Sequence, residues 1–230
     1  MMLYFMFMIP GVLLMLWAQS RVKGSYQKYS KVRINRNITG AEAARMVLDQ
    51  NGLQDVGIQP VKGELTDHYD PRNRTLFLSQ KIYSEPSIAS VAVAAHEAGH
   101  AIQHAQGYQP LKTRTAIVPL VSIGSNLGVF VLIAGLLMNA VPMAWAGVAL
   151  FGLSTLFALV TLPVEFDASK RAKVQLVQLG IVDGGVAGGA EAKGVDAMLD
   201  SAAWTYVAGF AASLLTLLYY VMQVAGMRRD

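Results

Sequence analysis

The sequence contains no cysteine, and this absence limits the kinds of site that the chain can build. Disulfides, iron–sulfur clusters and thiolate zinc sites are excluded, so a metal ion would have to be held by His, Asp or Glu. The absence does not identify a redox compartment, because a chain without cysteine suits either side of a membrane.

Charged residues are also scarce, at 15% of the 230 residues, against roughly 25% in a soluble domain. Hydrophobic residues make up 53%, and the mean hydropathy is +0.39. Three stretches carry no charged side chain at all: 1–20, 115–164 and 201–227. Such long uncharged stretches predict an integral membrane protein whose first partner is the lipid bilayer.

We expect about four transmembrane helices. The segment 1–20 lacks the basic start of a signal peptide, which favours an uncleaved anchor. Residues 119–138 and 143–162 are each about 20 residues long, enough to cross a bilayer. The turn at 139–142 makes them a hairpin, so the chain before and after it lies on one side of the membrane. The last span is expected at 204–224, followed by Arg228 and Arg229.

Basic residues predict the orientation of these spans. Six follow the first apolar segment: Arg21, Lys23, Lys28, Lys31, Arg33 and Arg36. The positive-inside rule places this cluster in the cytoplasm and the N-terminus outside. Four spans then put the C-terminus outside too, where Arg228 and Arg229 oppose the rule. Cations beside a span report orientation better than nucleic-acid binding, so we expect no nucleic-acid partner.

Between the first two spans the sequence predicts a small folded region. Thr39 and Glu42 have the spacing of a capping box, and a helix is expected at 41–50. Strands are predicted at 56–61 and 74–79, with a polar turn at 66–73. A long helix is expected from Ser84 to Gln106, with Ser84 as N-cap and Pro86 in its first turn.

The motif His96-Glu-Ala-Gly-His100 lies in this long predicted helix. Positions i and i+4 share one face of a helix, so both imidazoles can reach one metal ion. Glu97 points to the adjacent face, where it would meet a metal-bound water. Two neutral ligands, an open position and a base are what zinc-assisted hydrolysis requires, so we expect one catalytic Zn²⁺ with Glu97 as general base and acid.

A third protein ligand is needed, and the acids after the hairpin are the candidates. Glu165 comes first and directly follows a span, so we favour it as ligand, with Asp167 as the alternative. His104 continues the i, i+4 series but drifts around the helix, so we expect it to support the site or lie on the surface.

Two further features have open interpretations. His68 lies in the polar turn, where it would either donate to an oxyanion or be a solvated turn residue. Leu76, Phe77 and Leu78 form part of a predicted strand, which is either an edge strand that pairs with an extended substrate or a plain structural strand.

Four segments resemble the YugP-type neutral zinc metallopeptidases of bacterial membranes: Leu65–Pro71, Val93–His104, Leu162–Ser169 and Ala202–Ala208. The resemblance implies a membrane zinc protease with His96 and His100 as ligands and Glu97 as catalytic acid and base. Glu165 is similar in placement to the distal glutamate ligand of HtpX-type membrane proteases, which also carry a transmembrane hairpin before it. Those proteases usually have an Asp four residues later, where this chain has Ser169.

The sequence thus predicts a mainly α-helical integral membrane protein with a zincin-like metalloprotease domain and a small β element. Its expected parts are an anchor (1–20), the metalloprotease region (21–118), the hairpin (119–163), a third-ligand helix with a Gly-rich loop (164–203), and a C-terminal span and tail (204–230). We expect a multi-pass protein of the bacterial inner membrane that cleaves proteins or peptides, including membrane proteins, on the cytoplasmic side. The alternative is a non-catalytic scaffold or regulator that zinc stabilises.

Overall fold

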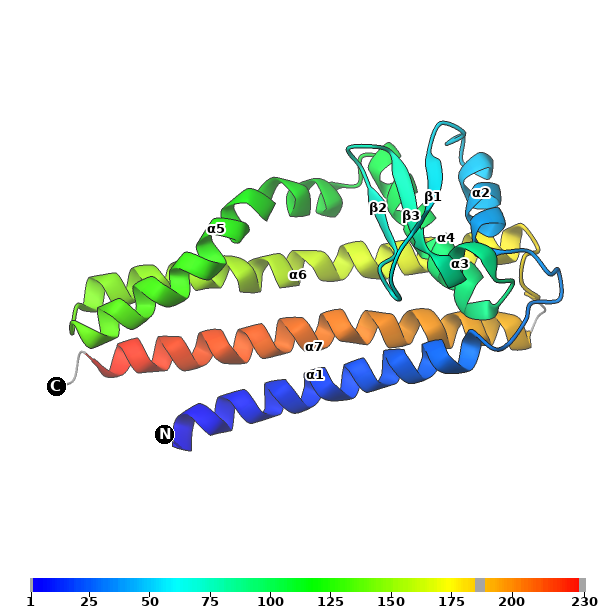
Figure 1. Cartoon of the computed structure of the whole chain (residues 1–230). Coiled ribbons are helices and arrows are strands. Elements are labelled where there is room, and N and C mark those ends of the chain that lie inside the picture. Colours follow the sequence, from blue (N-terminus) through cyan, green and yellow to red (C-terminus); the bar gives the residue numbers. More distant parts are fainter. Residues whose placement is uncertain (1, 185–188, 228–230) are drawn as a thin grey trace. The chain divides into compact units, whose positions relative to one another are not determined.

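The computed structural model of the chain describes residues 2–184 and 189–227, without the side chains of residues 125 and 126. Within this range the chain forms seven α-helices and a three-stranded sheet (Figure 1). The helices are α1 (Met2–Tyr29), α2 (Gly40–Gln50), α3 (Gln80–Ser84), α4 (Ile88–Ala105), α5 (Gln109–Leu137), α6 (Val141–Gln178) and α7 (Ala190–Gly226). The strands are β1 (Gly57–Val61), β2 (His68–Asp70) and β3 (Thr75–Ser79).

The chain divides into two compact units. Unit 1 comprises 1–19, 109–163 and 205–230, and unit 2 comprises 20–108 and 164–204. Among the described residues, α1, α5, α6 and α7 are long and apolar enough to cross a membrane. Large side chains of unit 1 such as Leu120, Phe130 and Leu137 are exposed, which a bilayer accommodates and water does not. The expected class, a mainly α-helical integral membrane protein with a small sheet, is confirmed.

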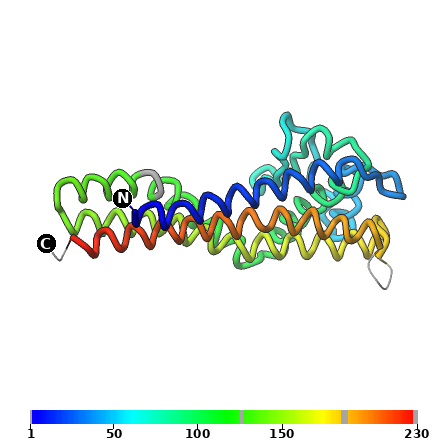
Figure 2. Tube along the Cα trace, turned by 90° about the horizontal axis from the view of Figure 1, so that it is seen from below, coloured from blue at the N-terminus to red at the C-terminus, as the bar shows by residue number. Residues whose placement is uncertain are grey.

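Small residues set the packing inside unit 1. A Cβ on Gly147 would lie 2.4 Å from the backbone nitrogen of Leu132, so α5 and α6 touch at this point. Figure 2 shows in green how these two helices turn back on each other. On α7, Ala212 lies against Gly11 of α1. Such close helix contacts are typical of membrane bundles, where small residues let backbones approach.

Unit 2 has its own hydrophobic core, built around the sheet and α4. The strand order is β1-β3-β2, with β1 parallel and β2 antiparallel to β3. Leu76 and Leu78 of β3 are fully buried and join a core that includes Val91 of α4, Leu176 of α6 and Met198 of α7. The part of α6 after residue 163 and the first turns of α7 therefore belong to the folded core of this unit.

Several predicted elements appear at their expected places. The capping box of α2 is present: Thr39 Oγ1 accepts from the Glu42 N–H, and Glu42 accepts from the Thr39 N–H. The strands predicted at 56–61 and 74–79 are β1 and β3, and the expected hairpin is α5 and α6. The third-ligand helix expected after the hairpin is part of α6, which runs without interruption through Pro163.

Two predictions were wrong. The long helix begins at Ile88 and not directly after Ser84, which is the last residue of α3, because Glu85 before Pro86 is extended and Ser87 caps α4 by accepting from the Ser90 N–H. The polar turn at 66–73 contains strand β2, which pairs with β3. Two interpretations were open for the strand at 76–78. It is not an edge strand, because β3 lies between β1 and β2 and both of its sides are paired.

The Gly-rich loop, which the sequence predicts at 180–194, ends earlier than expected, since α7 begins at Ala190. Residues 185–188 of that loop lie outside the described residues, as do Arg228 and Arg229.

Candidate metal centre

The centre is built where α4 crosses close to α6. Small residues on α4 allow this approach, and Gly99 is the clearest case. A Cβ on Gly99 would lie 2.7 Å from the carbonyl oxygen of Ala168 and 3.2 Å from its Cα, both backbone atoms that cannot move aside cheaply. The glycine inside the His-Glu-Ala-Gly-His motif therefore permits the helix contact that brings Glu165 to the two histidines.

His96, His100 and Glu165 come together at this contact. Glu165 Oε2 lies 3.3 Å from His96 Nε2 and 3.6 Å from His100 Nε2. One ligand atom from each residue lies within 4.8 Å of the others, and this is the group among the described residues with the composition and spacing to hold a metal ion. The two imidazole rings meet edge to face at an interplanar angle of 83°, so their nitrogens converge from different directions.

The electrostatic environment favours a cation at this place. Burial lowers the pKa of His100, but the hydrogen bond with Glu165 and the negative charges of Glu97 and Glu165 outweigh it and raise the pKa above its ordinary value. A proton on the imidazole and a metal ion between the ligands are stabilised by the same carboxylates. Glu97 itself is only 8% exposed, beside His96 on the buried side of α4.

Each histidine has a partner for its second nitrogen. His96 Nδ1 lies 3.1 Å from Ser169 Oγ, and His100 Nδ1 lies 3.0 Å from Gln103 Oε1. These bonds hold the rings so that both Nε2 atoms face Glu165. Such outer partners orient metal ligands and tune their affinity.

Asp167, the alternative third ligand, has other partners. Its Oδ2 accepts hydrogen bonds from Gln103 Nε2 at 2.8 Å and from the Arg171 guanidinium, which also donates to Gln106. Asp167 therefore reaches the histidines through the Gln103 amide, whereas Glu165 faces them directly.

The remaining predicted site residues lie around β2. His104 Nδ1 pairs with the Tyr69 hydroxyl at 2.9 Å, so this histidine joins α4 to β2. His68 is exposed, pairs with the Thr66 carbonyl and stacks on Phe77 at 5.0 Å between ring centroids. Leu76 and Leu78 are buried in the core.

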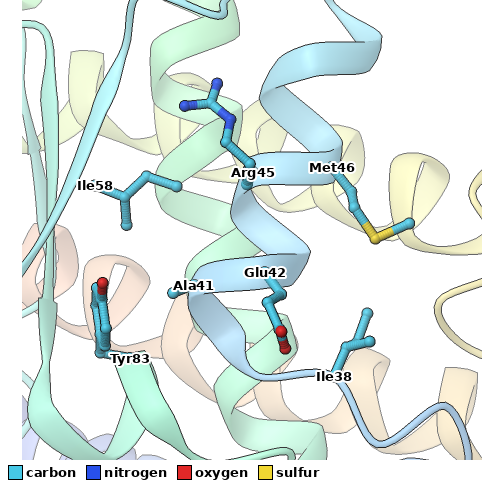
Figure 3. Close-up of a pocket in the computed structure, with 7 residues that line it drawn as sticks. All are labelled: Ile38, Ala41, Glu42, Arg45, Met46, Ile58 and Tyr83. Atoms are coloured by element: carbon cyan, nitrogen blue, oxygen red, sulfur yellow. The ribbon is translucent and has the colours of Figure 1, made fainter.

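Unit 2 also has an open pocket of about 610 Å³ beside α2 (Figure 3). Figure 3 shows that its lining side chains come from α2, the residue Ile38 before it, β1 and α3: Ile38, Ala41, Glu42, Arg45, Met46, Ile58 and Tyr83. None of them belongs to the histidine cluster. The largely apolar pocket is therefore separate from the histidine cluster.

Three residues of the centre escaped the sequence-based prediction. Gln103 and Arg171 carry hydrogen bonds that organise the cluster, and Ser169 orients His96. A signal existed for Gln103, which lies three residues after His100 and so on the same helix face, among apolar neighbours. Ser169 follows Glu165 by four residues on α6, where helical spacing again places both on one face.

Four apolar helices and a His–His–Glu group define an integral membrane protein with a candidate metal site. The chain belongs to the family described as "Putative neutral zinc metallopeptidase", whose model matches residues 4–225. It is 43% identical over 221 residues to the "Putative membrane protease YugP" of Bacillus subtilis (strain 168), and the alignment covers 96% of each chain. No solved structure matches the chain. The family resemblance expected from the motifs is confirmed.

Proposed function

We propose that the chain is a membrane-embedded zinc metalloendopeptidase that hydrolyses peptide bonds, with Glu97 as general base and acid. The observation that carries the proposal is the convergence of His96, His100 and Glu165 within 4.8 Å, with a buried glutamate adjacent to the first histidine. The family description and the name of the relative support the same class of activity.

The donor set fits zinc. Two imidazole nitrogens and one carboxylate make the three-ligand set of many catalytic zinc sites, which leaves a fourth position for water or substrate. Ser169 and Gln103 supply the partners that such histidines require on their second nitrogens. When bound there, zinc lowers the pKa of its water to about 7 and polarises the substrate carbonyl.

Glu97 supplies the proton transfers. It follows His96 directly, so its carboxylate leaves α4 beside the ligands rather than among them. A carboxylate in this position accepts the proton of the attacking water and later donates it to the leaving amine. Its burial keeps bulk water from competing for that proton.

The substrates we propose are proteins or peptides close to the membrane, including membrane proteins. Glu165 lies on α6, which also contains an apolar segment long enough to span a bilayer, so one ligand is a direct helical continuation of a span. The basic residues between Arg21 and Arg36 support a cytoplasmic position for the site in a bacterial inner membrane.

The test is Glu97→Gln in the full chain, purified in detergent or reconstituted in vesicles, with zinc content and cleavage of an unfolded protein measured in parallel. We expect zinc to stay bound while cleavage falls by at least about 10²-fold, the range for loss of a general base. Glu64→Gln is the matched control, because Glu64 is an exposed glutamate of the same unit that forms a surface ion pair with Lys81.

Persistent cleavage in Glu97→Gln would overturn the mechanism. Zinc binding without cleavage in the wild-type protein would instead support a non-catalytic, zinc-stabilised scaffold, in which Glu97 has no chemical task.

A further inference from the structure

Gln103 is a fully buried polar residue at the end of the metal-binding face of α4, and the proposed chemistry does not use it. Its side chain is 0% exposed and makes three hydrogen bonds. Oε1 lies 3.0 Å from His100 Nδ1, and Nε2 lies 2.8 Å from both the Val164 carbonyl oxygen and Asp167 Oδ2. A buried amide with every contact directed at a ligand or at a ligand-bearing helix calls for a functional explanation.

The partners on α6 determine which way the amide faces. A backbone carbonyl has only acceptor capacity, and so has a carboxylate that a guanidinium holds, as Arg171 holds Asp167. Both must therefore face the NH₂ group of Gln103. An inverted amide would set its oxygen against the oxygens of Val164 and Asp167 in a buried place, where it would accept from neither.

With the NH₂ group committed to α6, Oε1 needs a donor from His100. That donor is Nδ1–H, so when Nε2 binds a metal ion, or when the Glu165 carboxylate no longer accepts a hydrogen bond from it, the proton of the neutral imidazole lies on Nδ1 and the lone pair lies on Nε2. Nε2 is the atom that faces Glu165 Oε2 at 3.6 Å, inside the candidate metal centre. The hydrogen bonds of Gln103 to Val164, Asp167 and His100 thus leave the Nε2 lone pair of His100 available to bind a metal ion.

His96 provides the contrast. Its Nδ1 faces the Ser169 hydroxyl, which both donates and accepts hydrogen bonds. Ser169 therefore orients the His96 ring without selecting its tautomer. Of the two histidines, His100 is the one whose protonation pattern the surrounding side chains select.

We infer that Gln103 is a positioning residue that holds His100 in the Nδ1–H tautomer and ties it to the turn of α6 that carries Glu165. Val164 directly precedes Glu165, so one amide sets the state of one ligand and the place of another. The inference rests on the zinc site of the proposed function and adds a residue to it.

The first experiment reads the tautomer in zinc-free, full-length Glu165→Ala, because in the zinc-free wild-type protein the Glu165 carboxylate also accepts a proton from Nε2. The protein has four histidines, so ¹⁵N-histidine labelling gives few signals, and His100→Ala assigns the one of interest. Glu165→Ala also removes the hydrogen bond and the charge of Glu165 that raise the pKa of His100. Above about pH 8, where an ordinary imidazole with a pKa of ~6.5 is neutral, we expect His100 as Nδ1–H in this background. Addition of Gln103→Leu should move it toward Nε2–H. A His100 in the Nε2–H form in Glu165→Ala, or an unchanged tautomer when Gln103→Leu is added, overturns the inference.

Asp167→Asn gives a second variant that keeps Gln103 and the packing around it. Its carboxamide offers a donor to an inverted Gln103 amide, so we expect His100 to become a mixture of tautomers. If His100 stays entirely Nδ1–H in this variant, the hydrogen bonds of Asp167 and Val164 to the Gln103 amide do not select the tautomer of His100.

The second experiment measures zinc affinity by competition with a coloured chelator, in the Glu97→Gln background so that no proteolysis interferes. We expect Gln103→Leu to weaken zinc binding about 10–100-fold, the usual cost of losing such a supporting hydrogen bond. Ser90→Ala is the matched control, since Ser90 is a buried polar residue of α4 that bonds to Ser87 and lies away from the cluster. An equal loss in Ser90→Ala would show a general structural effect and overturn the assignment.

The two proposals fail separately. A wild-type protein that cleaves no substrate, with His100 as Nδ1–H in its Glu165→Ala variant, overturns the proposed function and leaves the tautomer assignment standing. An active wild-type protease with His100 as Nε2–H in its Glu165→Ala variant overturns the tautomer assignment and leaves the proposed function standing.

Discussion

Gly99 and Ala168 bring α4 and α6 so close that a Cβ on residue 99 would lie 2.7 Å from the Ala168 carbonyl oxygen. We expect Gly99→Ala to push the two helices apart and so to separate Glu165 from the histidines. Overpacking of this kind costs about 1–3 kcal/mol, and each kcal/mol lowers the unfolding midpoint of a protein of this size by about 2–4 °C. Thermal unfolding and zinc affinity are the measurements, and both should fall.

Gly24→Ala is the control for this substitution. Gly24 lies on α1, and an added Cβ there meets nothing within 4 Å. Because Ala is favoured over Gly inside a helix by roughly 0.5–1 kcal/mol, this variant should be as stable as the wild-type protein or slightly more so. Normal zinc binding in Gly99→Ala would show that the close approach is not required.

The third ligand is tested by comparing two acids on α6. Glu165→Ala should lose zinc, because the carboxylate that faces both histidines is removed. Asp167→Ala should keep stoichiometric zinc with weaker affinity, since Asp167 acts through Gln103. Metal analysis of the two purified proteins is the measurement. Full zinc occupancy in Glu165→Ala would show that Glu165 is not a ligand.

Asp67 gives a prediction on pH. Burial raises the pKa of Asp67, while hydrogen bonds from the Ser79 N–H and hydroxyl oppose the shift. The folded protein thus binds this proton more tightly than the unfolded chain, and ionised Asp67 costs folding free energy at neutral pH. That cost disappears as the pH falls through the raised pKa toward the ordinary value of ~3.9.

Asp67→Asn should therefore unfold at a higher temperature than the wild-type protein at neutral pH, and the difference should shrink toward about pH 4. Asp55→Asn is the control, because Asp55 forms an exposed ion pair with Arg74. Thermal unfolding at several pH values is the measurement, and a pH-independent difference for Asp67→Asn would contradict the prediction.

The orientation of the protein in the membrane can be measured by labelling single introduced cysteines, because the chain has no cysteine of its own. Met138, in the turn between α5 and α6, is 68% exposed, and Gln80 is an exposed residue of α3. In intact cells an impermeant maleimide should label Met138→Cys, whereas Gln80→Cys should react only after the membrane is opened. The reverse pattern would place the metal centre outside the cell.

The sequence was sufficient to predict the features of the structure that local interactions determine. Thr39 and Glu42 predict the start of α2 because both partners of the capping box lie within one turn. His96 and His100 predict two imidazoles on one face of α4 because helical geometry alone sets their spacing. The uncharged stretches predict the spans because no soluble core would bury so many consecutive apolar residues.

The start of α4 shows where local signals fail. Ser84 and Ser87 are both acceptable N-caps, and Pro86 is compatible with a helix start after either of them. The choice is made by a distant segment: the Ile34 N–H donates to the Pro86 carbonyl, and the Ile88 N–H donates to the Val32 carbonyl. These bonds hold residues 86–88 outside a continuous helix, and no local pattern contains them.

The composition and motif of this sequence were enough to predict a membrane protein with two histidines on one helix face and an adjacent glutamate, since each follows from composition or local spacing. The choice between Glu165 and Asp167 was left to the tertiary structure. Side chains two positions apart on a helix point in directions that differ by about 200°. Only one of these two acids can therefore face α4 directly. The contact between Gly99 and Ala168 sets that rotation, which turns Glu165 toward the histidines and leaves Asp167 to hold Gln103.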